Sequence, residues 1–271
     1  MAKETIAITG AAGGIGRAIA KKYIQTGARV AISDLNEELV IQTAKEIGAQ
    51  GYYCNVAKED SVEKFIHAVQ ADIGSIDVFV SNAGVGFPDQ PGGHAAGGSD
   101  ESWELSWQVN LMSNVYAGRH LIPDWIENKT GRFVVVASAA GLLSQVGTAS
   151  YTVTKHAAVG YAEYMAIMHK DDGIKVNCVC PQYVKTNMTK GMTVVQEGPN
   201  KHIEASDVAD SLFAAIAADE FLVLPHPIIG DYFQAKAVSH DRYIRGMAML
   251  KTGMESGHIH KMGGNNGKRK N

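Results

Sequence analysis

The chain has 271 residues, of which 45% are hydrophobic and 20% are charged. This length and composition suffice to bury the core of one large α/β domain. The formal net charge of -3 and a sequence pI near 6.4 give no electrostatic footprint for nucleic acid or for an anionic membrane surface. We therefore expect neither kind of partner.

The cysteines and the apolar runs indicate the compartment. Cys54, Cys178 and Cys180 make no disulfide framework, and no C-x-x-C or histidine-rich spacing accompanies them. The start of the chain lacks the charged and apolar regions of a leader, and no apolar run approaches the ~20 residues that span a bilayer. The histidines are scattered, as at His169 and His226, and are interpreted as ordinary surface or half-buried residues. We expect a reduced, cytoplasmic protein without a metal.

The chain opens with a strand, a glycine-rich turn and a helix. An apolar run at 5–8 precedes the turn at 9–16, and an amphipathic run at 17–24 follows it. Glycines here supply positive φ, let the backbone approach a ligand, and expose N–H groups at a helix N-terminus, where the dipole favours phosphate. The spacing Gly10-x-x-x-Gly14-x-Gly16 differs from G-x-G-x-x-G, so the strand-turn-helix context carries the prediction of a dinucleotide site. The alternative is an ordinary βα turn that is rich in glycine.

The second expected strand, 28–34, ends in a carboxylate. Asp34 lies 18 residues beyond Gly16, close to the ~20 expected for the acid that binds an adenosine ribose. A carboxylate accepts hydrogen bonds from ribose hydroxyls and repels a 2′-phosphate. Leu35 follows, and no Arg or Lys lies between Gly10 and Gly16. These residues predict NAD rather than NADP, and the alternative role for Asp34 is the N-cap of the helix that starts near residue 36.

The next segments alternate between helix and strand. The pattern predicts helices at 37–47 and 61–73 and strands at 51–54 and 76–81, which indicates a parallel sheet with right-handed crossovers. Polar and small residues follow the third and fourth strands, at the edge where doubly wound sheets bind ligands. These residues are Asn55, Val56, Asn82, Ala83 and Gly84. Asn82 is also a common turn residue.

The segment 86–100 is the least regular internal one, with two prolines and two glycine pairs. It is interpreted either as a flap on the substrate side of the cofactor or as a tolerated surface insertion. A long helical pattern then covers 102–121 with Asn110 in its middle. Asparagine is neutral to unfavourable inside a helix, which suggests that Asn110 has a special role.

Three polar residues in the next strand and helix predict the chemistry. A buried strand at 133–138 ends at Ser138, and a helix opens at Tyr151 with Lys155 four residues later on the same face. A tyrosine with a reference pKa near ~10 is a poor base, but a nearby ammonium and the positive oxidised nicotinamide favour the phenolate. Lys155 can also hold the nicotinamide ribose, and Ser138 can hydrogen-bond the reacting oxygen. Each residue alone could be structural; together, beside a dinucleotide turn, they favour catalysis.

This arrangement resembles the short-chain dehydrogenase/reductase (SDR) family over residues 5–186. The resemblance implies a Rossmann-type doubly wound parallel sheet in a single domain, and hydride transfer between NAD(P) and a carbinol carbon. Tyr151 would be the general acid/base, Ser138 would orient the substrate oxygen, Lys155 would bind ribose and lower the pKa of Tyr151, and Asn110 would hold a water in a proton relay. The expected catalytic residues are Asn110, Ser138, Tyr151 and Lys155. The expected cofactor-binding residues are Gly10, Gly14, Ile15, Gly16, Asp34, Leu35, Asn55, Val56, Asn82, Ala83, Gly84, Tyr151, Lys155, Pro181, Val184 and Thr186, of which Val184 and Thr186 would hold the nicotinamide carboxamide.

The chain departs from the family pattern at three positions. Asn55 stands where an aspartate is usual, Ser81 where a first asparagine is common, and Gln182 where a glycine usually follows Pro181. Asn55 can still accept from the adenine amino group through its carbonyl. Gln182 adds a side chain at the floor of the substrate pocket, where it can shape specificity.

Beyond Thr186 the resemblance weakens. We expect a catalytic domain over 1–230, with a substrate lid at 187–205, and a C-terminal extension of helix and basic tail over 231–271. Met188 and Met192 in the lid either adapt to apolar ligands or fill core space. We expect a helix at 205–218 and a last strand at 220–224. The extension then covers the pocket, caps the sheet edge or docks on a partner subunit.

The leading hypothesis is an NAD-dependent oxidoreductase acting on a bulky, hydrophobic secondary alcohol or its ketone. The alternatives are a dihydrodiol or ketoacyl oxidoreductase of the same fold, or a non-catalytic NAD-sensing protein. A homodimer or homotetramer, formed through the helices that contain Asn110 and Tyr151, is implied by the resemblance alone.

Overall fold

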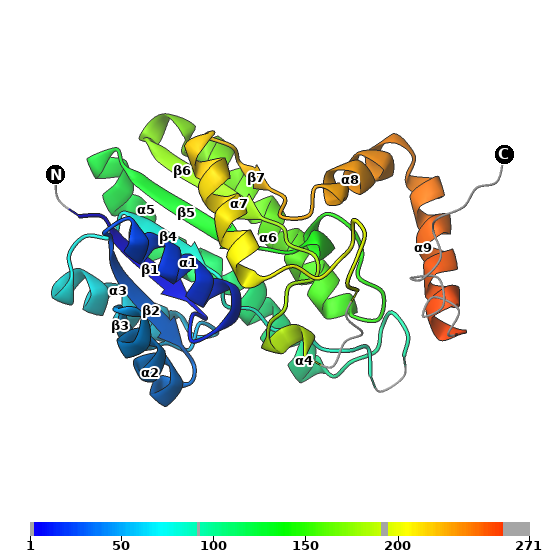
Figure 1. Cartoon of the computed structure of the whole chain (residues 1–271), viewed down its shortest axis with the longest axis horizontal. Helices are drawn as coiled ribbons and strands as arrows, with labels where there is room; N and C mark the ends of the chain where they lie inside the picture. Colours follow the sequence, from blue (N-terminus) through cyan, green and yellow to red (C-terminus); the bar gives the residue numbers. More distant parts are fainter. Residues whose placement is uncertain (1–2, 91–92, 191–194, 257–271) are drawn as a thin grey trace.

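The structure, a computed structural model, describes residues 3–90, 93–190 and 195–256. Within these residues seven parallel strands form one sheet in the order β3-β2-β1-β4-β5-β6-β7 (Figure 1). The strands are β1 (Thr5–Thr9), β2 (Arg29–Asp34), β3 (Gln50–Tyr53), β4 (Val78–Ser81), β5 (Gly131–Val136), β6 (Ile174–Val179) and β7 (Leu222–Val223). The order reverses between β1 and β4, which confirms the expected doubly wound Rossmann-type sheet and places a ligand site at their carboxyl ends.

Helices cover both faces of the sheet. One face carries α1 (Gly14–Gln25), α2 (Glu37–Ile47) and α7 (Ala205–Ala217), and the other carries α3 (Glu59–Asp72), α5 (Ser113–Asn128) and α6 (Ala149–Met168). The core consists of two clusters because alternate residues of β1 point to opposite faces of the sheet. Ile6 and Ile8 belong to the cluster under α1, α2 and α7, and Ala7 belongs to the cluster under α3, α5 and α6. Both clusters are buried, as expected of a parallel sheet between helical layers.

The start of α2 settles the alternative role of Asp34. The side chain of Asn36 accepts a hydrogen bond of 3.0 Å from the Leu39 N–H, so Asn36 is the N-cap. The helix spans Glu37–Ile47 and ends at Gly48 in the left-handed conformation. The interpretation of Asp34 as this N-cap is therefore wrong.

The helix expected over 102–121 is interrupted. The chain forms α4 (Asp100–Trp107), a π-helical segment (Gln108–Met112) and then α5, which continues to Asn128. Asn110 lies in the π segment and is buried. Such π segments are rare and occur frequently at functional sites.

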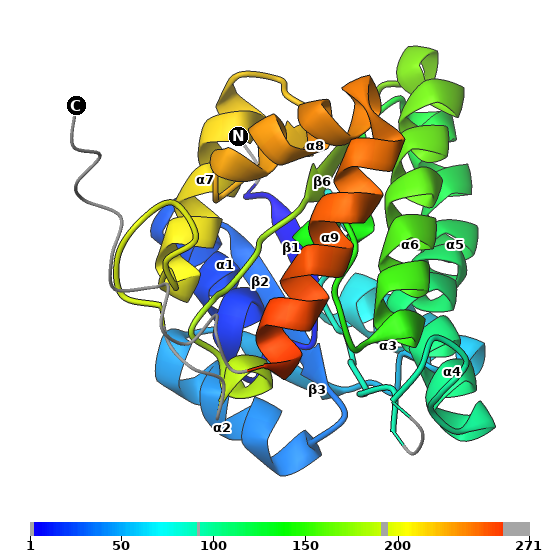
Figure 2. The same ribbon diagram turned by 90° about the vertical axis from the view of Figure 1, so that its right-hand side faces the viewer.

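The C-terminal part forms two helices, α8 (Ile228–Val238) and α9 (His240–Glu255). They stand at the right of Figure 1, and α9 runs across the front of Figure 2. The expected strand at 220–224 shortens to β7, although the Phe221 carbonyl still accepts a hydrogen bond from the Cys178 N–H of β6 at 2.7 Å. Among the described residues, no helix is long and apolar enough to cross a membrane.

Candidate active site

The glycine turn between β1 and α1 leaves no room for side chains at two positions. At Gly10, which has φ +61°, an added Cβ would lie 2.7 Å from the Ala83 Cα. At Gly16 an added Cβ would lie 2.6 Å from the Asn82 amide nitrogen and 2.9 Å from the Ala11 Cα. Both residues must therefore be glycine if the turn is to stay tight against β4.

The N-terminus of α1 is open to a ligand. The helix starts at Gly14, next to Ile15, and its N-cap Gly13 provides no side-chain cap for the first N–H groups. The added Cβ at Gly13 would meet nothing within 4 Å. Exposed N–H groups at the positive end of a helix dipole are suited to a phosphate group.

Asp34 stands beside this turn at the end of β2. One of its carboxylate oxygens accepts a hydrogen bond from the Ala12 N–H at 3.2 Å, and the other accepts from the Asn36 N–H at 3.2 Å. These bonds fix the carboxylate next to the glycine turn. Leu35 follows with an exposed side chain.

Asn82 holds the turn rather than pointing away from it. Its amide donates to the carbonyl oxygens of Thr9 and Gly10 at 3.0 and 2.8 Å. The Thr9 hydroxyl accepts from the backbone N–H groups of Asn82 and Ala83 at 3.1 and 3.2 Å. The side chain predicted as a cofactor contact thus fastens the cofactor turn to the end of β4.

Asn55 and Val56 follow β3 as predicted. The Asn55 side-chain oxygen accepts from the Ala57 N–H at 3.1 Å, and the Asn55 N–H donates to the Ser61 hydroxyl at 2.9 Å. This oxygen retains a second lone pair, and Val56 is buried behind it.

Asn110 clamps the segment that follows β4. Its side-chain oxygen accepts from the Val85 N–H at 2.9 Å, and its amide donates to the Val85 carbonyl at 2.9 Å and to the Thr154 hydroxyl at 3.0 Å. An added Cβ at Gly84 would lie 3.4 Å from both Asn110 Oδ1 and Lys155 Nζ. Asn110 therefore positions residues 84–86 beside Lys155.

Ser138, Tyr151 and Lys155 come together as predicted. Ser138 follows β5, is buried, and forms a hydrogen bond with the phenol of Tyr151. The ammonium of Lys155 lies 5.7 Å from the centroid of the Tyr151 ring and donates to the Val136 carbonyl at 3.0 Å. These contacts place a hydroxyl, a phenol and an amine at the carboxyl end of the sheet.

Burial shifts the pKa values of both Tyr151 and Lys155. Burial raises the pKa of Tyr151, and the hydrogen bond from Ser138 opposes this only in part. Burial also lowers the pKa of Lys155 to about 8. These directions hold for the chain without a cofactor; the lowering of the Tyr151 pKa by Lys155 together with an oxidised nicotinamide stays a prediction for the complex.

The segment after β6 closes the site. The Pro181 carbonyl accepts from the Ala139 N–H at 2.8 Å, which joins this segment to the residue after Ser138. Val184 is buried, and Thr186 lies against the glycine turn, since an added Cβ at Gly14 would be 3.2 Å from Thr186 Cγ2. Met192 of the expected lid lies outside the described residues.

A pocket of about 840 Å³ adjoins these residues. Its walls come from the segment after Ser138, from Gln182 and Tyr183, and from α8 and α9, and they are mostly apolar: Ala139, Ala140, Leu143, Val146, Ile229, Tyr232, Val238, Tyr243, Met247, Leu250 and Met254. Neither Ser138 nor Tyr151 is part of the lining, and the pocket comes nearest to them in sequence at Ala139 and Ala140, which follow Ser138. The side-chain oxygen of Gln182, at the pocket, is buried and has no hydrogen-bond partner among the described residues.

Sequence reasoning missed several residues that build this pocket. Tyr243 in α9 accepts a hydrogen bond from the Ser144 N–H at 2.7 Å, and Lys236 in α8 donates to the Leu142 carbonyl at 2.7 Å. His226, interpreted as an ordinary residue, is buried and accepts from the Gln182 N–H at 3.3 Å. These hydrogen bonds join segments that are distant in sequence, so no local sequence pattern predicts them.

The first residues of the 86–100 loop lie against the site. An added Cβ at Gly86 would be 3.3 Å from the Tyr151 ring. Asp89 accepts from the Ala149 N–H at 2.6 Å, and its own N–H donates to the Gly147 carbonyl at 2.9 Å. The start of the loop is thus fixed to the beginning of α6.

Comparison with known proteins gives the class. Residues 4–196 match the family model for short chain dehydrogenases. The chain belongs to this family and is an oxidoreductase of the SDR class.

Curated relatives share about a third of the aligned residues. The mouse epidermal retinol dehydrogenase 2 is 32% identical over 206 residues, which cover 71% of this chain and 64% of the relative. A 3beta-hydroxysteroid dehydrogenase 2 from Eggerthella lenta is 33% identical over 71% of this chain and 75% of the relative. The meso-2,3-butanediol dehydrogenase of Serratia marcescens is 34% identical over 69% and 74%, respectively. These alignments cover between 64% and 75% of the relatives' own lengths.

Solved structures agree in fold. A short chain dehydrogenase/reductase from Burkholderia phymatum in complex with NAD has a TM-score of 0.78 and 25% identity, over 88% of this chain and 94% of that chain. A 3-ketoacyl-(acyl-carrier-protein) reductase from Brucella melitensis complexed with NADH has a TM-score of 0.76 and 26% identity, over 82% and 95%.

Proposed function

We propose that the protein is an NAD-dependent oxidoreductase that interconverts a bulky, hydrophobic secondary alcohol and its ketone. The observation that carries the proposal is the grouping of Ser138, Tyr151 and Lys155 beside a glycine turn and an apolar pocket. The names of the relatives that act on retinol and on a hydroxysteroid support a bulky apolar alcohol.

The described residues fit a dinucleotide. The turn is closed to side chains at Gly10 and Gly16, and the first N–H groups of α1 have no side-chain cap, which suits a pyrophosphate. Asp34 would accept hydrogen bonds from the adenosine ribose and repel a 2′-phosphate. When bound, the oxidised nicotinamide accepts the hydride.

The proton would be transferred between the reacting oxygen and residues of the chain itself. The raised pKa keeps Tyr151 a neutral phenol in the chain alone, so it is ready to donate a proton to a ketone oxygen. Alcohol oxidation requires the reverse, a phenolate, which the positive charge of Lys155 and of the oxidised cofactor would favour. Ser138 would hold the reacting oxygen, and the hydrogens of Lys155 that do not reach the Val136 carbonyl are available to a ribose hydroxyl. Asn110, by holding residues 84–86, would leave room for a water beside Lys155.

The pocket supports the substrate class. A volume of about 840 Å³ falls in the range of ligand sites, and its walls are mostly aliphatic and aromatic. A rotation of the Gln182 side chain, which lines the pocket, would let its unpartnered oxygen accept a hydrogen bond from a second polar group of the substrate. We also propose that residues 187–205 form a lid over a catalytic domain of residues 1–230, and that α8 and α9, at the start of the 231–271 extension, complete the pocket.

Nicotinamide absorbance tests the proposal. The protein is incubated with NAD or NADP and with secondary alcohols that range from butan-2-ol to hydroxysteroids and terpenols. We expect turnover with NAD that increases with apolar bulk. Asp34→Asn should reduce the preference for NAD, whereas Glu37→Gln, which removes an exposed carboxylate from the first turn of α2, should not. Equal efficiency of the parent with NADP would contradict the role of Asp34.

We further propose a cytoplasmic homodimer or homotetramer. One side of α6 exposes apolar side chains, at Val153, Tyr164, Ile167 and Met168, and Gly160 on the same side leaves space for a close approach. Such an apolar stripe is suited to a second helix. Sedimentation should show an oligomer that Ile167→Glu dissociates, and a monomeric parent would contradict this assembly.

A further inference from the structure

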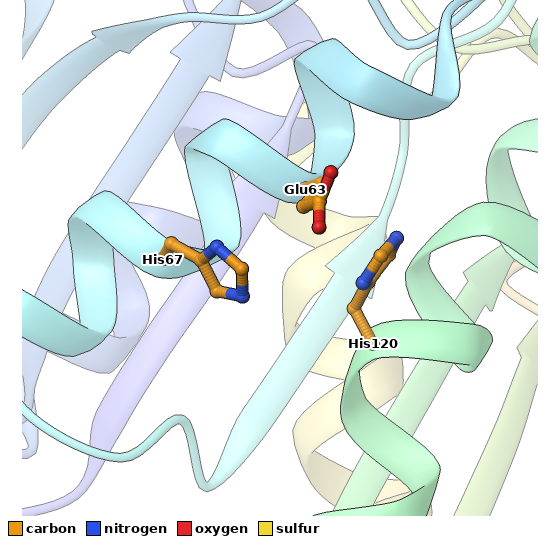
Figure 3. Close-up of side chains that lie close together, drawn as sticks. All are labelled: Glu63, His67 and His120. Atoms are coloured by element: carbon orange, nitrogen blue, oxygen red, sulfur yellow. The ribbon is translucent and has the colours of Figure 1, made fainter.

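Three side chains outside the catalytic region converge between α3 and α5 (Figure 3). Glu63 and His67 lie one turn apart on α3, and His120 extends from α5. The ligand atoms that they offer all lie within 4.8 Å of one another. In the sequence only Glu63 and His67 stand at a spacing that places them on one helix face. His120 is distant in sequence and joins them only when α3 and α5 pack together, so the expectation of no metal did not include this group.

None of these three side chains forms a hydrogen bond with another described residue. Glu63 and His67 form no hydrogen bond or ion pair with any other residue in the described ranges. His120 Nε2 is shielded from solvent and has no hydrogen-bond partner among the same residues. The Glu59 carboxylate lies 3.9 Å from it and bonds to Arg119 at 2.7 Å through its other oxygen. A shielded imidazole nitrogen without a partner is unusual, because buried polar atoms are almost always paired.

Two imidazoles and a carboxylate are a ligand set that zinc prefers. Tetrahedral coordination at Zn–N distances near 2.0–2.1 Å places ligand atoms about 3.3 Å apart, so small side-chain rotations would close the present arrangement. The half-exposed Glu63 and the exposed His67 are free to make them. Neutral imidazoles with one carboxylate give the site a net negative charge, which suits a divalent cation.

We propose that Glu63, His67 and His120 bind a divalent ion of the zinc class that links α3 to α5, with water or Glu59 as the fourth ligand. The two helices already pack through Phe65, Ile66 and Leu121 in one core cluster. A metal across their outer edges would fix their relative position. None of its ligands belongs to the catalytic or cofactor-binding residues, so the ion would act on stability and not on the hydride transfer.

Zinc titration of the chelator-treated full chain tests the site. The background variant carries His258→Ala and His260→Ala, since these two histidines near the C-terminus offer other ligands. Calorimetry should show one saturable Zn²⁺ site per chain, and Zn²⁺ should raise the melting temperature. His67→Ala and Glu63→Gln are suitable variants because these side chains are at least partly exposed, and His120→Gln keeps the volume of the half-buried one.

Each of these three variants should weaken Zn²⁺ binding about tenfold or more, since even the loss of a group that hydrogen-bonds to a ligand costs 10–100-fold at metal sites, and should abolish the thermal shift. The control His240→Ala removes an exposed histidine of α9 and should change neither value. Circular dichroism confirms that each variant is folded before titration. Absence of saturable binding in the background variant, or affinity unchanged in His67→Ala and His120→Gln, would overturn the proposal.

Discussion

Lys155 is predicted to destabilise the native chain at neutral pH, and its replacement by methionine tests this directly. The amine is buried, and its pKa falls from an ordinary value of 10.5 to about 8, which is equivalent to about 3 kcal/mol of lost stability. Methionine has a similar length and no charge. Its substitution leaves the Val136 carbonyl without its 3.0 Å donor, which costs about 1 kcal/mol. The variant should therefore be more stable by about 2 kcal/mol at neutral pH.

The pH dependence of stability distinguishes the removal of a buried charge at Lys155 from a change in side-chain packing. Between about pH 8 and pH 10.5 the unfolded chain keeps the Lys155 proton that the native chain has released. Because the unfolded state then binds more protons, the stability of the parent rises with pH across this window. The advantage of Lys155→Met should narrow by about 2 kcal/mol between pH 7 and about pH 9.5.

Urea unfolding of the cofactor-free protein, followed by circular dichroism at both pH values, measures this difference. The variant should also lose NAD-dependent turnover, because Lys155 is proposed to hold the nicotinamide ribose. A variant that is less stable than the parent at neutral pH, or whose advantage is the same at both pH values, would refute the reasoning.

Three further predictions concern the supports of the site. Asn82→Ala removes the amide that donates to the Thr9 and Gly10 carbonyls. The free energy of unfolding, measured by chemical denaturation, should fall by about 2 kcal/mol, and the affinity for NAD, measured by calorimetry, should weaken. Gln182→Ala removes the unpartnered oxygen at the pocket and should raise KM for the best alcohol about tenfold with little change in kcat; an unchanged KM would remove Gln182 from the substrate site. Tyr243→Phe removes the acceptor for the Ser144 N–H and should raise KM about threefold to fivefold without loss of NAD affinity.

The sequence was most informative where local patterns decide the structure. The bounds of α2 are those expected, because Asn36 and Gly48 mark its two ends by their own chemistry. The buried runs of β1, β2 and β5 likewise predicted the sheet. The spacing of Tyr151 and Lys155 predicted that these two side chains lie close together. Strand and helix ends moved by a few residues, as at β4 and α3.

Contacts between distant segments explain what the sequence could not show. The π segment at Asn110 depends on an amide that reaches Val85 and Thr154, so the helical period alone predicted a continuous helix. Whether the pKa of Tyr151 lies above or below its ordinary value depends on how deeply the fold buries the phenol. The convergence of His120 with α3 likewise appears only when the helices pack.

The proton role of Tyr151 is central to the proposed reaction, and Tyr151→Phe tests it. The substitution keeps the ring and removes only the hydroxyl, so NAD affinity measured by calorimetry should stay within about twofold of the parent while turnover of the best alcohol falls about 10²–10⁴-fold. Retention of both binding and turnover within about tenfold of the parent would contradict the assignment of Tyr151 as the general acid/base.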